Sequence, residues 1–123
     1  PRHCASAGGE VTVITREEKA ARFRALHERG TFVIPNPWDA GTAKVCEQLG
    51  FLALATTSGG LAMSLGRPDA ANAVSRDEAL ANARQIVEAT TLPVSADLEN
   101  GYGESPDACA ATIEAAAAAG LCG

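Results

Sequence analysis

Two carboxylates lie two residues apart in the segment SADLENGYGE, residues 95–104, where an apolar run meets glycines. Side chains at i and i+2 of a strand project from one face, so Asp97 and Glu99 would lie together at the end of the run. Such a pair can hold a hard cation such as Mg²⁺, which binds one or two carboxylates together with water and substrate oxygens. The same residues could instead form only a turn and a helix cap.

Further polar or aromatic residues and glycines follow two earlier apolar runs, TFVIP at 31–35 and FLALAT at 51–56. They are Asn36, Trp38 and Asp39 after the first run and Ser58, Gly59 and Gly60 after the second. In barrels and in open α/β sheets, the site lies at the carboxyl ends of the parallel strands. We therefore expect these residues to meet Asp97 and Glu99 at one edge of a sheet.

The connection after the second run is long. About eighteen residues, TSGGLAMSLGRPDAANAV, separate it from Ser75, whereas connections between a strand and a helix usually take ~2–6 residues. Long loops at the carboxyl ends of strands commonly carry binding residues. The pattern predicts an extended binding loop over residues 57–74.

Four segments carry the start and stop signals of helices. Thr15 with Glu18 and Ser75 with Glu78 form capping boxes, Asp39 can cap a third helix, and Ser105 followed by proline opens the last. The predicted helices span residues 15–28, 40–49, 75–89 and 105–119. Between them, residues 31–35, 51–56 and 92–98 are predicted strands, and LCG at 121–123 is predicted to begin a fourth.

The order of these elements is typical of a parallel α/β domain. The apolar runs lack the alternation of a strand with one solvated face, as expected when helices cover a parallel sheet on both sides or surround a barrel. We expect residues 1–14 to form a poorly ordered arm and residues 15–123 to form one domain.

Composition excludes several classes of function. The net charge of the 123 residues is -5, and no cluster of Lys and Arg is present to follow a nucleic-acid backbone. No apolar run approaches the ~20 residues that span a bilayer, and no signal peptide is recognisable. The four cysteines show neither close pairs nor metal-site spacing and are predicted to be free thiols. A cytoplasmic protein that binds neither nucleic acid nor membranes is expected.

Four segments, in this order, resemble the isocitrate lyase/phosphoenolpyruvate mutase superfamily: IPNPWDAGTAK, ALATTSGGLAMSLGRPD, VSRDEALAN and LPVSADLENGYGE. The resemblance implies a TIM-type (β/α)₈ barrel with an additional N-terminal helix. A closed barrel needs eight strands, so this chain would supply the N-terminal half of an unclosed barrel, with three βα units and the start of a fourth strand.

The resemblance also implies roles for individual residues. Asp97 and Glu99 match the two acids of the metal motif, Glu99 being one methylene longer than the Asp of many members, and Asp69 matches an acid near the metal shell. The metal would be Mg²⁺, with Mn²⁺ as an alternative. The backbone N–H groups of Ser58, Gly59 and Gly60 would hold the substrate carboxylate, Asp97 would also contact the substrate, and Trp38 would form an apolar wall.

Cys122 lies in a C-G pair, and the lyase branch of the superfamily carries its catalytic cysteine in a K-[KR]-C-G-H loop. Because Cys122 precedes the position at which that loop would begin, we interpret it as a buried strand residue. The catalytic residues are not identified by the sequence, because the catalytic loop would follow residue 123.

The resemblance implies a Mg²⁺-dependent lyase or phosphonomutase that makes or breaks a C–C or P–C bond in a small 2-oxo or 2-hydroxy carboxylate, through an enolate. The longer protein would form a homo-oligomer, by resemblance a tetramer, and the 123-residue chain alone is expected to be inactive. One alternative is a non-catalytic fragment or degenerate remnant that acts at most as an assembly module. Another is a small flavodoxin-like receiver or nucleotide-binding domain. This alternative is disfavoured because PNPWDAG lacks a phosphate-binding glycine pattern.

Overall fold

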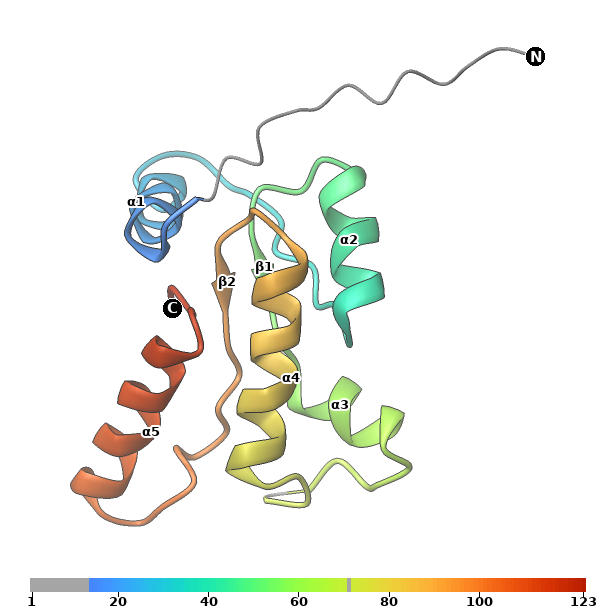
Figure 1. The fold of residues 1–123 in the computed structure, drawn as a ribbon, viewed down its shortest axis with the longest axis vertical. Helices are drawn as coiled ribbons and strands as arrows, with labels where there is room; N and C mark the ends of the chain where they lie inside the picture. Colours follow the sequence, from blue (N-terminus) through green and yellow to red (C-terminus); the bar gives the residue numbers. More distant parts are fainter. Residues whose placement is uncertain (1–13, 71) are drawn as a thin grey trace.

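A computed structural model describes residues 14–70 and 72–123 (Figure 1). The described residues form five helices and one two-stranded sheet. In chain order these are α1 (Arg16–Leu26), α2 (Ala40–Gln48), β1 (Leu54–Ala55), α3 (Ser58–Ser64), α4 (Arg76–Ala89), β2 (Val94–Ser95) and α5 (Pro106–Ala118). None of these helices is long and apolar enough to cross a lipid bilayer. The prediction for residues 1–14 lies outside the described residues, apart from Ile14.

The four predicted helices are confirmed, together with the residues that start them. Thr15 Oγ1 accepts a hydrogen bond from the Glu18 N–H at 3.2 Å, and Glu18 Oε2 accepts one from the Thr15 N–H at 2.8 Å. Ser75 and Glu78 form the same reciprocal pair at the start of α4. Asp39 caps α2 and Ser105 caps α5. Each cap satisfies backbone donors that the first turn of a helix leaves without partners.

The two strands pair in parallel, with Leu54 opposite Val94 and Ala55 opposite Ser95. Regular pairing covers two residues of each predicted strand, because side chains replace the backbone ladder beyond them. The Asp97 N–H donates to Thr56 Oγ1 at 3.1 Å instead of to a carbonyl of β1. The α/β class is confirmed, and the sheet within the described residues is open and shorter than expected.

The prediction of a strand at residues 31–35 is wrong. The Ala55 N–H donates to Pro35 O at 3.1 Å, so this segment lies beside β1, but no strand is formed there. Pro35 and Pro37 have no N–H to return to β1. The side chain of Asn36 supplies the missing donor, with Nδ2 at 3.1 Å from Ala55 O.

Residues 121–123 lie beside β2 without forming the predicted strand. The Cys122 N–H donates to Val94 O at 2.8 Å, and Gly123 O accepts from the Ala96 N–H at 2.9 Å. Cys122 is half-buried and lies outside any strand, so its interpretation as a buried strand residue is corrected.

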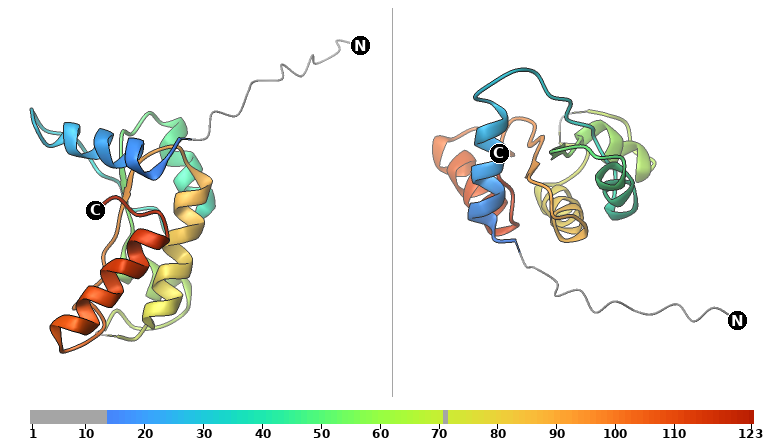
Figure 2. Two further views of the ribbon diagram at one scale, coloured as in Figure 1. Left: turned by 60° about the vertical axis from the view of Figure 1, so that its left-hand side comes forward. Right: turned by 90° about the horizontal axis from the view of Figure 1, so that it is seen from above.

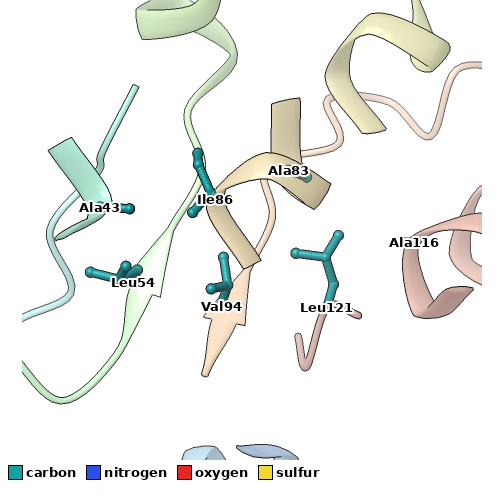
Figure 3. Close-up of a cluster of buried hydrophobic side chains, with 7 residues drawn as sticks. All are labelled: Ala43, Leu54, Ala83, Ile86, Val94, Ala116 and Leu121. Atoms are coloured by element: carbon teal, nitrogen blue, oxygen red, sulfur yellow. The ribbon is translucent and has the colours of Figure 1, made fainter. Parts of the chain in front are cut away.

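The hydrophobic core lies between the strands and α4. Leu54, Val94 and Leu121 lie in a row, with Ala83 and Ile86 of α4 beside them (Figure 3). Ala43 of α2 and Ala116 of α5 complete the cluster. Small alanine side chains let helices approach the strands closely, and α4 contacts α2, α3 and α5.

Helix α1 lies near the end at which the strands begin, whereas α3 and the turn after β2 lie toward the opposite end (Figures 1 and 2). Lys19 of α1 is 7% exposed, and its Nζ donates to Thr90 O at 2.8 Å and to Val87 O at 3.3 Å. The last carbonyls of a helix have no partners within the helix. Lys19 therefore caps the C-terminal end of α4 and attaches α1 to it.

Replacing Lys19 by methionine should lower the free energy of unfolding by about 1–3 kcal/mol, because the carbonyls of Val87 and Thr90 lose a charged donor. Chemical denaturation measures this change. Lys44→Met, at an exposed position of α2, is the matched control and should leave stability nearly unchanged. Equal effects of the two substitutions would contradict the capping role of Lys19.

Candidate functional site

The connection predicted as a loop contains helix α3, which starts directly after β1. Thr57 Oγ1 accepts a hydrogen bond from the Gly60 N–H at 3.2 Å and caps the helix. Ser58, Gly59 and Gly60 therefore form its first turn. The sequence predicted an extended loop here, but burial of Leu61 and Ala62 together with the cap stabilises a helix.

Asp97 connects the end of β2 to the start of α3. Its Oδ2 accepts hydrogen bonds from the Ser58 N–H at 3.1 Å and from Ser58 Oγ at 2.8 Å. Its Oδ1 accepts a hydrogen bond from the Glu99 N–H at 3.0 Å. The structure thus brings Asp97 to Ser58, as the sequence predicted.

The next two residues of α3 contact two further predicted site residues. A Cβ atom at Gly59 would lie 2.9 Å from Asp69 Oδ2. One at Gly60 would lie 2.6 Å from both Cδ1 and Nε1 of the Trp38 indole. Gly60 therefore requires the absence of a side chain, whereas a methyl group at Gly59 would meet only the movable carboxylate of Asp69. Asp69 and Trp38 both lie against the first turn of α3.

Glu99 reaches a different part of the connection. Its Oε2 accepts a hydrogen bond from the Asn72 N–H at 2.8 Å. Strand β2 ends at Ser95 and Glu99 has φ 49°, so the prediction that Asp97 and Glu99 share the face of a strand is wrong. A turn, instead of a strand, places the two acids near each other.

The hydrogen bonds of Asp97 determine its charge state. Burial is the largest single influence and opposes ionisation, but the Glu99 N–H and the hydroxyl and N–H of Ser58 together hold the pKa of Asp97 below its usual range. Asp97 is therefore a carboxylate at neutral pH, with both oxygens engaged.

The three predicted site residues that precede α2, namely Asn36, Trp38 and Asp39, make different contacts. Trp38 is 44% exposed, and its carbonyl accepts a hydrogen bond from Asn82 Nδ2 at 2.8 Å. Asp39 Oδ1 accepts from the Thr42 N–H at 2.7 Å and so caps α2. Asn36 bonds to β1. Trp38 is thus the member of this group that contacts α3.

Of the backbone N–H groups of residues 58–60 that were predicted to bind a carboxylate, some already donate hydrogen bonds within the protein. The N–H of Ser58 donates to Asp97, and that of Gly60 donates to Thr57. Within the described residues, the N–H of Gly59 makes no such bond. An incoming carboxylate would therefore meet Gly59 directly and would have to displace Asp97 from Ser58.

The carboxylates at this edge could bind a cation, but they do not enclose a site made of protein ligands alone. Across residues 14–70 and 72–123, no three His, Cys, Asp or Glu side chains are grouped to hold a metal. Asp97, Glu99 and Asp69 nevertheless supply hard carboxylate oxygens beside one edge. Mg²⁺ keeps several waters and needs only one or two carboxylates. The metal role of these residues stays a prediction.

An ion pair that the sequence analysis missed holds the segment containing Asp69. Arg67 Nη1 and Nη2 lie 2.8 Å from Glu78 Oε2 and Oε1, and Nη1 also donates to Ala73 O at 3.3 Å. Arg67, ahead of the hydrogen bonds from Ser75, lowers the pKa of Glu78 to about 2. The sequence showed only the capping role of Glu78, because its partner Arg67 lies eleven residues away.

Comparison with known proteins places this arrangement in a family. The phosphoenolpyruvate phosphomutase family matches residues 23–123. The chain belongs to the isocitrate lyase/phosphoenolpyruvate mutase superfamily. The family expectation from the sequence is thereby confirmed.

Several relatives show how the chain compares with longer proteins. It is 41% identical over 88 residues to 2,3-dimethylmalate lyase of Eubacterium barkeri, covering 70% of this chain and 30% of the lyase. A crystal structure from Burkholderia cenocepacia J2315, assigned provisionally as a lyase/mutase, has 55% identity and a TM-score of 0.83 and covers 86% of this chain and 38% of that one.

A structure of oxaloacetate acetylhydrolase with its product oxalate has 31% identity and a TM-score of 0.76, and covers 85% of this chain and 37% of that one. The chain thus spans less than two fifths of the length of these relatives. Any activity of the whole protein that carries this chain is therefore a proposal.

Gly60→Ala should displace the Trp38 indole, because the new Cβ would lie 2.6 Å from its atoms. We expect a red shift of tryptophan emission, and Trp38 is the only tryptophan of the chain. Overpacking should also lower the free energy of unfolding by about 1–3 kcal/mol. Gly59→Ala is the matched control, since it meets the movable carboxylate of Asp69 and should leave the emission unchanged. Identical spectra for both variants would contradict this packing.

Glu78→Gln should reduce the pH dependence of stability in acid. The pKa of Glu78 is lowered from 4.5 to about 2, so the stabilisation by its carboxylate is present above pH 4.5 and lost as pH falls toward 2. Urea unfolding across this range should give a flatter profile for the variant. Glu88→Gln, exposed on the same helix, should retain the wild-type slope.

Proposed function

We propose that the protein carrying this chain is a Mg²⁺-dependent lyase or phosphonomutase that acts on a small 2-oxo or 2-hydroxy carboxylate. The observation that carries the proposal is the contact of Asp97, Asp69 and Trp38 with three consecutive residues, Ser58 to Gly60. These contacts place two of the three predicted acids, Asp97 and Asp69, beside the predicted carboxylate-binding segment. Residues 15–123 would form the N-terminal part of a TIM-type barrel.

In this proposal, Asp97 and Glu99 would hold the cation, with the carboxylate of Asp69 nearby. When bound, the cation supplies Lewis-acid stabilisation of the negative charge that develops on an enolate oxygen. Trp38 lies against Gly60 and would exclude water from one side of the ligand. The N–H of Gly59 would donate to the ligand carboxylate.

The relatives support a carboxylate ligand. The 2,3-dimethylmalate lyase and oxaloacetate acetylhydrolase act on small organic acids, and the latter is known in complex with oxalate. Oxalate resembles the enolate of pyruvate in its two adjacent oxygen-bearing carbons. It is therefore a suitable probe for this site, because it tests binding without requiring the unidentified catalytic residues.

Calorimetric titration of Mg²⁺ and oxalate into the polypeptide encoded by the natural gene tests the proposal. Oxalate should bind only when Mg²⁺ is present. Asp97→Ala should weaken this binding at least tenfold, because the variant lacks a carboxylate for the cation.

Glu114→Gln is the control for removal of one negative charge, since Glu114 lies exposed on α5. It should bind Mg²⁺ and oxalate as the wild type does. Metal-independent binding of oxalate, or unchanged binding by Asp97→Ala, would show that residues 95–104 form only a capped turn and that the superfamily chemistry does not extend to this protein.

A further inference from the structure

Side chains from two helices hold the backbone of Trp38, which lies outside any helix or strand. The Trp38 N–H donates to Thr42 Oγ1 at 3.0 Å, and the Trp38 carbonyl accepts from Asn82 Nδ2 at 2.8 Å. Backbone polar groups that no regular structure satisfies need partners of this kind. Thr42 belongs to α2, which follows directly in the chain, whereas Asn82 lies 44 residues away on α4. Asn82 is therefore the long-range anchor of Trp38.

The indole of Trp38 is not enclosed by its surroundings. It lies against Gly60, and Trp38 is 44% exposed. It also lines a groove of about 340 Å³ together with Leu61, Leu65 and Ala81, so space is open beside it. Packing fixes a side chain where neighbouring atoms fill the space around it. The position of this ring therefore depends on where the backbone of Trp38 is held.

Asn82 holds the Trp38 carbonyl from a well-anchored element. The neighbouring Ala83 and Ile86, one turn further along α4, are 1% and 0% exposed and belong to the hydrophobic core. Helix α4 packs against both α2 and α3. A group that must be placed within a fraction of an ångström is best supported by such a packed helix.

The predicted cation ligands are held by other contacts. Asp97 accepts hydrogen bonds from Ser58, and Glu99 accepts one from the Asn72 N–H. A change at Asn82 reaches the predicted carboxylate-binding segment by way of Trp38, whose ring lies against Gly60. The carboxylates of the turn after β2 keep their own partners.

We propose that Asn82 is a positioning residue, which holds the Trp38 indole against Gly60 as one wall of the ligand site. This inference rests on the proposed function and adds to it a residue that acts on the organic ligand through another side chain. Loss of the Asn82 hydrogen bond would let the ring turn away from Gly60 and admit water beside the ligand. Affinity for the cation alone would stay unchanged.

Asn82→Asp tests this role, because aspartate has nearly the shape of asparagine but an aspartate carboxylate has no N–H to donate. Affinity for oxalate in saturating Mg²⁺ should fall about three- to tenfold, the effect of one neutral hydrogen bond. Affinity for Mg²⁺ alone should change less than twofold. Emission of Trp38, the only tryptophan of the chain, should shift to the red as the ring becomes more exposed.

Gln85→Glu is the matched control. It makes the same change from amide to carboxylate at an exposed position of α4 that lines the same groove. Emission and oxalate affinity should remain those of the wild type. Equal effects of Gln85→Glu and Asn82→Asp would overturn the inference, because the added charge would then explain both.

A second pair of variants shows whether Asn82 acts through Trp38. In Trp38→Ala protein there is no ring to position, so Asn82→Asp should lower oxalate affinity less than twofold further. A merely structural contribution of Asn82 would lower affinity equally in both backgrounds, which would overturn the inference. Asn82→Ala removes the donor without adding charge and replaces Asn82→Asp in both titrations if the latter does not fold.

Two further results would overturn the inference while leaving the proposed function intact. They are unchanged oxalate affinity after loss of the Asn82 donor, and a parallel loss of Mg²⁺ affinity. A wild-type protein that binds no oxalate in Mg²⁺ overturns both the inference and the proposed function. The wild-type and variant titrations therefore distinguish the two failures.

Discussion

The parallel pairing of β1 with β2 is the constraint on which the rest of this structure depends. Parallel strands end at the same edge of a sheet and require a crossover between them. Here α4 forms that crossover and buries Ala83 and Ile86 against the strands. As a result, the first turn of α3 and the turn after β2 meet at one edge, although their residues lie about forty positions apart in the sequence.

At this edge, side chains replace the backbone ladder. Thr56 accepts the N–H of Asp97, Asp97 accepts that of Ser58, and Glu99 accepts that of Asn72. The residues expected to bind a cation therefore also hold neighbouring segments together. A ligand that takes these carboxylate oxygens must offset the loss of the hydrogen bonds, so binding and local order at this edge are energetically linked.

The helices were predictable from sequence because their determinants are local. Capping residues such as Thr15 and Ser75 act on N–H groups three positions away, and each fixed the start of a helix. The strands and α3 depend on contacts across the chain and were predicted less well. The sequence located Asp97 near Ser58 because both follow the carboxyl ends of predicted parallel strands, whereas the ion pair of Arg67 and the buried hydroxyl of Tyr102 arise from tertiary packing. Neither has a signal in residue spacing.

The two prolines beside β1 have a consequence for self-association. Unpaired backbone groups along the side of a sheet can recruit strands from other molecules, which leads to aggregation. Pro35 and Pro37 offer no N–H, and the amide of Asn36 already occupies Ala55 O. This border of the sheet cannot template a regular intermolecular ladder, so the sequence protects it against fibril-like growth even though Val33 next to it is 67% exposed.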